Sequence, residues 1–265
     1  MSVDEYLKAA IDAAVDAGQY LKKNLDESRQ IYFKGEVNLV TDFDNRSQEM
    51  ILERLFARFP EHDFLAEEGL SEEKGADFRW IIDPLDGTTN YAHRFPIFCV
   101  SIALEKRGDI ILGVVYDPMR EEQFSAVKGR GASLNGEKIG VSSVSDLDKS
   151  LLSTGFPYDV RESPVNNIVH FSNFVTRAQA VRRCGSAAMD LCYVACGRFD
   201  GFWELKLYPW DVAAASLIVK EAGGELSDFE NGKFSIYSSE ILATNGCIHK
   251  QMVEVLQLGK NQDFS

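Results

Sequence analysis

The sequence is best interpreted outward from one stretch, Trp80-Ile81-Ile82-Asp83-Pro84-Leu85-Asp86-Gly87-Thr88-Thr89-Asn90. Its apolar beginning predicts a buried strand that delivers Asp83 at its end, where Pro84 interrupts the hydrogen-bond ladder. A turn of this spacing can bring Asp83 and Asp86 to one point. Two carboxylates that close repel each other unless a proton or a cation lies between them. Hard oxygen ligands suit Mg²⁺ or Mn²⁺, and the Leu85 carbonyl can add another oxygen.

The residues directly after this acidic pair favour an anion. Gly87-Thr88-Thr89 offers backbone N–H groups and a glycine that permits close approach. If a helix begins here, its dipole supports the bound anion. An Asp-Gly pair alone is usually an ordinary turn, but here a strand, a proline and a second aspartate accompany it. Metal ligands followed at once by an anion-binding turn indicate phosphate chemistry.

Two further acidic elements support the same interpretation. Glu67 and Glu68 follow a predicted strand at 63–66, and Asp211 opens an apolar helix at 210–222. Taken alone, the first is explained by a solvated loop and the second by an acid in the first turn of a helix. Each of the three elements places an acid where a strand ends or a helix begins, so together they predict one carboxylate-lined site.

The remaining pattern predicts a mixture of helices and strands. In the first half, an apolar stripe from Leu7 to Leu25 indicates a helix, and a second helix begins at Thr41 or Asp42 and ends before Pro60. A mostly antiparallel sheet follows, with strands at 63–66, 80–82, 98–106, 110–116 and 123–127. In the second half we expect strands at 151–153 and 202–203, and helices at 163–177, 187–196, 210–222 and 253–258, the second of these apolar nearly all round and therefore buried. We predict a single catalytic domain over 1–265, softly divided into an α+β half at 1–148 and an α/β half at 149–265.

Composition sets limits on the class of protein. Apolar residues form 45% of the 265 residues, which is enough for a core, and the formal net charge is −13. An acidic surface repels nucleic acid, so direct nucleic-acid binding is not expected. Bound divalent cations can invert the field of an acidic cleft, so an anionic substrate is compatible with this charge.

Cysteine usage and hydropathy indicate a cytoplasmic protein. The five cysteines form no CxxC pair and fit free thiols in a reducing compartment. The beginning MSVDEYLK carries acids where a signal peptide carries basic residues, and no stretch reaches the length of a membrane span. No membrane interaction is therefore expected.

Three motifs carry a resemblance to a known family. AEEG at 66–69, DPLDGTTN at 83–90 and WDVAAASLIVKEAGG at 210–224 resemble the signature motifs of the inositol monophosphatase family, in the same order. The resemblance extends from about 38–41 to Gly223-Gly224. It implies a layered α/β/α/β/α sandwich, a lithium-sensitive and Mg²⁺-dependent phosphatase, and a homodimer.

The resemblance also implies a set of metal ligands. Glu67, Asp83 and the Leu85 carbonyl would bind the first metal ion, and Asp83, Asp86 and Asp211 would bind the second. A third, weaker Mg²⁺ would use Glu67 and waters. This makes two to three Mg²⁺ per subunit, with Mn²⁺ as an alternative. The metal-activated water would then attack the phosphorus of a phosphate monoester.

Catalytic and substrate-binding roles follow from the same resemblance. Thr88 and Glu67 would orient the attacking water, and Asp44 would hydrogen-bond Thr88. Lys34 is a weaker candidate for the site. The residues implied to bind substrate are Asp86, Gly87, Thr88, Gly185, Ser186, Ala187, Glu204 and Asp211.

Several functions remain open on the sequence alone. The first is hydrolysis of inositol 1-phosphate or a similar small sugar or polyol phosphate. The second is a fructose-1,6-bisphosphatase or a phosphatase of NADP or 3′-phosphoadenosine nucleotides in the same superfamily, because the metal and phosphate groups are shared. The third is a regulatory binding partner of the transcription or RNA machinery, which could coexist with catalysis.

Overall fold

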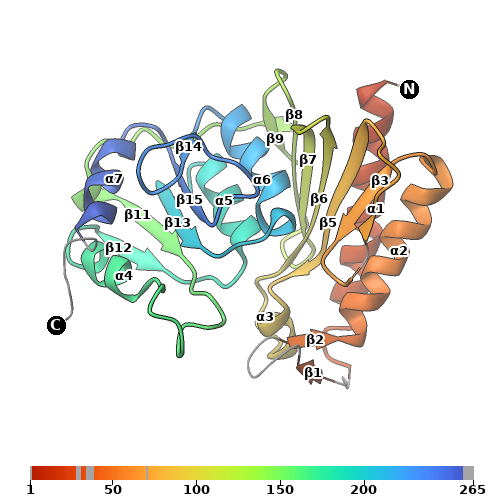
Figure 1. Cartoon of the computed structure of the whole chain (residues 1–265), viewed down its shortest axis with the longest axis horizontal. Coiled ribbons are helices and arrows are strands. Elements are labelled where there is room, and N and C mark those ends of the chain that lie inside the picture. Colours follow the sequence, from red (N-terminus) through yellow and green to blue (C-terminus); the bar gives the residue numbers. More distant parts are fainter. Residues whose placement is uncertain (1, 28–30, 34–38, 70, 259–265) are drawn as a thin grey trace.

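The computed structural model describes residues 2–27, 31–33, 39–69 and 71–258. Figure 1 shows helices and sheets alternating in five layers across the long axis of the molecule. Two long helices cover one sheet, two buried helices separate it from a second sheet, and two short helices cover the outer face of the second. The predicted α+β layered sandwich is confirmed.

The first layer is formed by α1 (Val3–Lys23) and α2 (Asp42–Arg58). Ser2 caps α1 in a capping box with Glu5, which satisfies backbone donors at the helix start. The buried face of α1 is mostly alanine, so the helix packs closely against the sheet. In the chain between these helices, β1 (Ile31–Phe33) pairs with β2 (Leu39–Thr41) in antiparallel fashion.

The first sheet is mostly antiparallel, as predicted. Within the described residues it has eight strands in the order β10-β9-β8-β7-β6-β5-β3-β4, and only β3 and β5 run parallel. Its strands are β3 (Asp63–Ala66), β4 (Ser71–Glu72), β5 (Phe78–Asp86), β6 (Cys99–Lys106), β7 (Asp109–Asp117), β8 (Glu122–Val127), β9 (Ala132–Leu134) and β10 (Glu137–Lys138).

One strand boundary differs from the prediction. We expected Pro84 to end the strand at 80–82, but β5 continues through it to Asp86. The register between β5 and β6 shifts between Asp83 and Asp86, so the proline is accommodated in an irregularity of the ladder. The Ser47 hydroxyl of α2 donates to the Pro84 carbonyl at 2.7 Å, which satisfies an oxygen that the ladder leaves unpaired.

The central layer consists of α5 (Ala187–Ala195) and α6 (Pro209–Glu221). All nine residues of α5 are buried, which confirms the prediction made from its apolar surface. Gly113 of β7 lies so close to α6 that an added Cβ would overlap the Ala214 backbone. The absence of a side chain at this position therefore allows the helix to lie directly on the sheet.

The second sheet runs β12-β11-β13-β15-β14 within the described chain. Its strands are β11 (Leu151–Thr154), β12 (Ala180–Arg182), β13 (Gly201–Leu205), β14 (Glu225–Ser227) and β15 (Glu240–Thr244), and β11 runs parallel to β12 and β13. The outer helices are α4 (Ile168–Val175) and α7 (His249–Gln257), and a 3₁₀ turn (Leu147–Lys149) precedes β11.

The helix predicted at 163–177 is shorter than expected. It begins at Ile168 because buried Asn167 makes contacts that hold the preceding chain in turns. Asn167 Nδ2 donates to Thr154 Oγ1 at 2.7 Å and to the Gly155 carbonyl at 2.6 Å, and its Oδ1 accepts from Trp203 Nε1 at 2.7 Å.

The strands of the first sheet lie between residues 63 and 138, and those of the second between 151 and 244. The core around α5 and α6 contains side chains from both sheets, such as Ile81 and Phe202. A single domain with a soft division near residue 148 stays a prediction. No helix in the described part of the chain is long and apolar enough to cross a membrane.

Candidate active site

Most of the predicted site residues line one cavity. It has a volume of about 310 Å³ and lies where the ends of β3, β5 and β13 meet the start of α6. From the predicted set, its walls contain Glu67, Asp83, Leu85, Asp86, Gly87, Thr88, Glu204 and Asp211. A smaller cavity of about 90 Å³ adjoins it, shares the walls formed by Asp86, Glu204 and Asp211, and adds Gly185, Ser186 and Ala187.

A larger cavity of about 510 Å³ lies at the other end of α6, near Leu217 and Lys220. None of the predicted site residues lines it. Size therefore does not identify the site in this molecule. The site is identified by its concentration of buried and half-buried carboxylates, because groups of like charge are brought together only where a proton or a cation relieves their repulsion.

Asp83 is the most enclosed of these acids. It is 1% exposed, and its Oδ1 accepts a hydrogen bond from the Leu85 backbone N at 3.0 Å. Burial raises the pKa of Asp83 well above its ordinary value, and the charges of Glu67, Asp86 and Asp211 raise it further. A cation placed among these four groups would offset the repulsion that contributes to that shift.

Asp86 and Asp211 face the cavity from opposite halves of the chain. Asp86 ends β5, and its Oδ2 accepts from Ser186 Oγ and from the Ala188 backbone N, both at 2.7 Å. Asp211 lies in the first turn of α6, where its Oδ2 accepts from the Tyr208 backbone N at 2.7 Å. The pKa of Asp211 is raised well above its ordinary value, first by burial and then by the charge of Asp86.

Glu67 is positioned by two elements. Its backbone N donates to the Ile82 carbonyl of β5 at 3.2 Å, which continues the pairing of β3 with β5. The next residue is fixed by α2, because Gln48 Oε1 accepts from the Glu68 backbone N at 3.0 Å and Gln48 Nε2 donates to the Glu68 carbonyl at 3.2 Å. The Glu67-Glu68 corner is therefore held on both sides.

Thr88 and Asp44 form the pair that was expected. Asp44 of α2 is fully buried, and its Oδ1 accepts from the Thr88 hydroxyl at 2.9 Å. The Leu85 carbonyl lies 3.1 Å from the same hydroxyl. Thr88 begins the short helix α3 (Thr88–Ala92), and Gly87 before it has φ of +100°. A Cβ at Gly87 would lie 3.0 Å from the Ile97 carbonyl, so glycine suits both the dihedral angle and the space.

Glu204 is buried on β13 between the two cavities. Burial first, and the charge of Asp190 second, raise its pKa from 4.5 to about 8, while Arg183 opposes the shift. Gly155 makes room for this carboxyl, because an added Cβ would overlap the Glu204 side chain. At neutral pH the group is mostly protonated and can both donate and accept a hydrogen bond.

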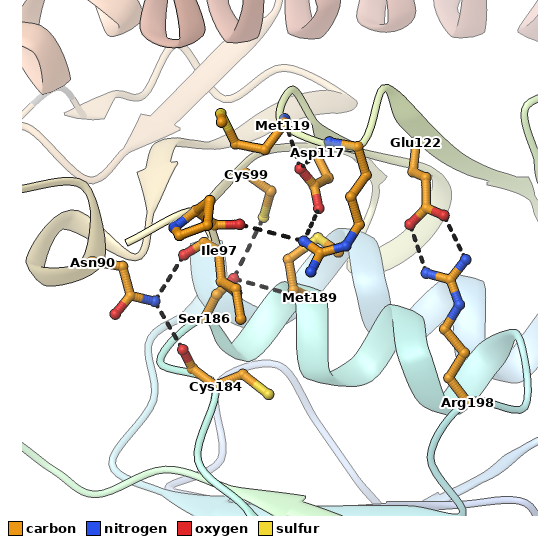
Figure 2. Close-up of polar contacts among 12 residues, drawn as sticks. Asn90, Ile97, Cys99, Asp117, Met119, Glu122, Cys184, Ser186, Met189 and Arg198 are labelled. Atoms are coloured by element: carbon orange, nitrogen blue, oxygen red, sulfur yellow. Dashed lines mark hydrogen bonds and ion pairs between the residues drawn. The ribbon is translucent and has the colours of Figure 1, made fainter. Parts of the chain in front are cut away.

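A polar network joins the loop before α5 to the first half of the chain (Figure 2). Asn90 Nδ2 donates to the Ile97 carbonyl at 2.7 Å and to the Cys184 carbonyl at 2.8 Å. Cys99 Sγ lies 3.6 Å from Ser186 Oγ in the same view. These contacts fix the stretch 185–187 beside Asp86, although about 100 residues of sequence separate the two.

Some residues that line the site were not predicted. Aromatic side chains stand at its wall, namely Phe156, Tyr158, Tyr208 and Trp210. Tyr158 and Tyr208 are more than half exposed, and the Tyr208 ring stacks on Trp210 at 5.0 Å. Asp190 of α5, buried in the smaller cavity, was also missed. Its polar character within an apolar helix was the available signal. The weaker candidate Lys34 and residue 70 lie outside the described residues.

The residues present fit a hard divalent cation in their chemistry. The four carboxylates predicted to bind metal line the same cavity as Leu85, whose carbonyl was predicted as a further ligand, and all of these donors are oxygen. Across the part of the chain that is described, however, no three His, Cys, Asp or Glu side chains meet closely enough to enclose a metal ion as they stand. The fit therefore rests on the donor set and on its mutual repulsion. The detailed ligation stays a proposal.

Comparison with known proteins agrees with the motifs. The model of the inositol monophosphatase family matches residues 2–259. The chain is 45% identical to the inositol-1-monophosphatase of Synechocystis sp., covering 95% of this chain and 88% of that protein. It is 41% identical to a protein of Escherichia coli named Nus factor SuhB, covering 93% and 94%.

A solved structure supports the same assignment. The inositol monophosphatase of Anabaena (Nostoc) sp. is 43% identical, superposes with a TM-score of 0.89, and covers 97% of each chain. The family consists of metal-dependent phosphatases. This chain belongs to the inositol monophosphatase family, and it is a phosphoric monoester hydrolase of that type.

Proposed function

We propose that this chain is a Mg²⁺-dependent phosphatase that hydrolyses inositol 1-phosphate or a similar small sugar or polyol phosphate. The observation that carries this proposal is the convergence of Glu67, Asp83, Asp86 and Asp211 on one cavity, next to the hydrogen-bonded pair of Thr88 and Asp44. Mn²⁺ is the alternative cation, because it takes the same hard oxygen ligands.

The carboxylates would hold the cations in two groups. Glu67, Asp83 and the Leu85 carbonyl form the first group, and Asp83, Asp86 and Asp211 form the second, with a third, weaker site at Glu67. Such ions, when bound, supply positive charge that neutralises the phosphate and makes a nearby water more acidic. Asp83 would be shared between the two groups. This fits the observation that the charges of the other three carboxylates all raise its pKa.

Thr88 would orient the attacking water. Its hydroxyl hydrogen is directed to Asp44 Oδ1 or to the Leu85 carbonyl, so Oγ1 is left as an acceptor toward the cavity. A water that donates one hydrogen to Thr88 and another to the Glu67 carboxylate presents its lone pair to the phosphorus. The water oxygen would form the new bond to phosphorus as the bond to the alcohol oxygen breaks. The proton of the water would pass to the Glu67 carboxylate, the leaving alcohol oxygen would take a proton from solvent water, and no covalent intermediate with the protein is required.

The polyol would occupy the end of the cavity near Glu204. This buried carboxyl can donate to one hydroxyl and accept from another, because its pKa is raised to about 8. Backbone N–H groups at Gly87 and Thr88 would bind the phosphate, and the stretch from Gly185 to Ala187, which lies beside Gly87, lines the adjoining smaller cavity. A ligand with a phosphate at one end and hydroxyls at the other matches this arrangement.

Phosphate release from a panel of substrates tests the proposal. The panel is inositol 1-phosphate, fructose 1,6-bisphosphate, a nucleotide 3′-phosphate and NADP, each with Mg²⁺ and with EDTA and Li⁺ controls. We expect Mg²⁺-dependent release that is fastest with inositol 1-phosphate and inhibited by Li⁺. Faster turnover of the bisphosphate or of a nucleotide would favour the alternative phosphatases. No release by protein that binds Mg²⁺ would contradict this substrate class.

The second candidate is a regulatory role in the transcription or RNA machinery. It is favoured by the 41% identity to the Escherichia coli protein named Nus factor SuhB. The net charge of −13 disfavours direct RNA binding. In this second candidate function, the chain would therefore bind a protein of that machinery. A catalytically inactive variant that still binds such a partner would separate this role from hydrolysis. We also propose that the chain forms a homodimer, which a sedimentation measurement in solution would test.

A further inference from the structure

The side chain of Asp86 is held by the beginning of α5, a helix from the other half of the chain. Ser186 is the N-cap of α5 and donates from Oγ to Asp86 Oδ2 at 2.7 Å. The Ala188 backbone N donates to the same oxygen at 2.7 Å. Cys99 Sγ lies 3.9 Å from it and closes the remaining side with a weak contact.

These contacts assign the hydrogen of the Ser186 hydroxyl. Oγ accepts from the Met189 backbone N at 3.3 Å, which is its capping bond, and it gives its single hydrogen to Asp86. Ser186 is only 2% exposed, and Figure 2 shows it between Cys99 and Met189. The hydroxyl is therefore fully used within the protein and has no hydrogen left for a substrate.

The same contacts select one oxygen of Asp86. Two short hydrogen bonds and the positive end of the α5 dipole act on Oδ2, which leaves Oδ1 as the oxygen available to a cation. Donors to the ionised form also oppose the effect of burial on the pKa of Asp86. A carboxylate fixed in this way is ready to bind, since no rotamer has to be ordered when the ion arrives.

The loop before α5 is fixed, so the N-cap Ser186 keeps its place beside the end of β5. Asn90 of α3 binds the Cys184 and Ile97 carbonyls through one amide nitrogen. It thereby ties the residue two positions before Ser186 to the chain that enters β6. The helix start and Asp86 are consequently held to the same point of the first half.

We propose that Ser186 is a positioning residue, which sets Asp86 for metal binding and does not contact the substrate. This differs from the role that the family resemblance implies for it. The inference rests on the proposed function, because it requires Asp86 to be a metal ligand.

Three substitutions at this position separate metal positioning from helix capping. Ser186→Ala removes both the donor to Asp86 and the cap. Ser186→Gly removes the donor to Asp86 but keeps a residue that is favoured at the N-cap. Ser186→Thr keeps both. The matched control is Cys99→Ala, which shortens a buried side chain against the same oxygen and leaves the hydroxyl donor in place.

Mg²⁺ binding is measured by calorimetry without substrate, and turnover of inositol 1-phosphate is measured beside it. We expect Ser186→Ala and Ser186→Gly to weaken Mg²⁺ binding similarly, by roughly 10- to 100-fold, as for other partners of metal ligands. At saturating Mg²⁺ their KM should change less than threefold. Ser186→Thr and Cys99→Ala should bind Mg²⁺ within about threefold of the wild type.

Two results would overturn the inference while the proposed function stands. One is Mg²⁺ binding by Ser186→Gly at the wild-type affinity. The other is a large rise in KM with unchanged Mg²⁺ binding, which would make Ser186 a substrate contact. If the wild-type protein itself neither binds Mg²⁺ nor turns over a phosphate monoester, the proposed function fails and this inference fails with it.

Discussion

Asp83 and Asp117 are both buried acids of the first sheet, yet their surroundings are opposite. Asp117 Oδ1 accepts from the backbone N of Met119 at 2.8 Å and of Arg120 at 3.1 Å, and the Arg120 guanidinium donates to Oδ2 at 3.1 Å. Burial raises the pKa of each acid, but Arg120 opposes the shift at Asp117, while Glu67, Asp86 and Asp211 increase it at Asp83.

In this molecule, a structural acid and a functional acid are distinguished by the groups that surround them. Asp117 is surrounded by donors from its own turn, so its charge is balanced within the fold. Asp83 has one backbone donor and three acids for neighbours, so its charge is balanced only by something that the chain does not supply. Such an imbalance lowers the stability of the folded protein and is typical of sites that bind cations.

Replacing Asp83 and Asp117 in separate variants should give the largest difference in activity. Asp83→Asn should lower kcat/KM by at least about 10³-fold, because it removes the ligand shared by two metal groups. Asp117→Asn should retain activity within a few-fold and change stability by no more than about 1 kcal/mol, because burial disfavours the charge of Asp117 while Arg120 and the backbone donors favour it. Phosphate release and urea unfolding measure the two effects. Retained turnover in folded, Mg²⁺-loaded Asp83→Asn would remove the basis of the comparison.

Asp83 should also lower the thermal stability of the protein when cations are chelated. A folded-state pKa raised above the unfolded value means that ionised Asp83 destabilises the fold at pH 8. Asp83→Asn should therefore melt above the wild type in EDTA, by about 2–4 °C for each kcal/mol relieved. A lower Tm for Asp83→Asn than for the wild type would contradict this account of its surroundings.

Substitution of Thr88 tests the proposed role of its hydroxyl in orienting the attacking water. Thr88→Ala should lower kcat by roughly 10²-fold with little change in Mg²⁺ binding, because an oriented acceptor for the water is lost. Thr88→Ser keeps the hydroxyl that donates to Asp44 and should retain most of the activity. Steady-state kinetics at saturating Mg²⁺ distinguish the two. Equal loss in both variants would point to packing and not to the hydroxyl.

Much of the secondary structure, and the meeting of the motif residues at one place, could be predicted from the sequence. Apolar periodicity located the helices α1, α5 and α6, and turn residues located the hairpin of β6 and β7. The motif residues all lie in or beside one cavity because each follows the end of a strand or begins a helix, and these ends meet at one edge of the sandwich.

What the sequence did not show depends on contacts between distant segments. The bond between Ser186 and Asp86 spans 100 residues, and no local pattern specifies it. The short form of α4 depends on Asn167, whose partners Thr154 and Trp203 lie on two strands of the second sheet. The sequence predicted that the helix of Asp190 is buried, but not that Asp190 faces the smaller cavity, because that depends on how the helix packs between the sheets.

Glu204 predicts a dependence of stability on pH. Its pKa rises from 4.5 to about 8 on folding, so the folded state holds the proton more tightly than the unfolded state. Its contribution is fully present below about pH 4.5 and is lost as the pH rises to about 8. In EDTA, the Tm of the wild type should therefore fall over this window by more than that of Glu204→Gln. The exposed Glu121→Gln serves as a control and should follow the wild type, and parallel curves for all three would contradict the assignment.

The smallest effect is expected far from the cavity. Arg198 and Glu122 form a bidentate ion pair at the surface, seen at the right of Figure 2. Arg198 is 41% exposed, so solvent screens the pair and Arg198→Ala should change stability by no more than about 1 kcal/mol. Activity should not change. A loss of turnover in this variant would show that the site depends on charges outside the two cavities.

Calorimetric titration with Mg²⁺ would show whether Asp83 binds metal, and it requires no knowledge of the substrate. The wild type and Asp117→Asn should bind two or more Mg²⁺ per chain with similar affinity, while Asp83→Asn should lose the two sites that share this ligand. Equal Mg²⁺ binding by Asp83→Asn and the wild type would contradict the claim that the buried, mutually repelling acids form the metal centre of this phosphatase.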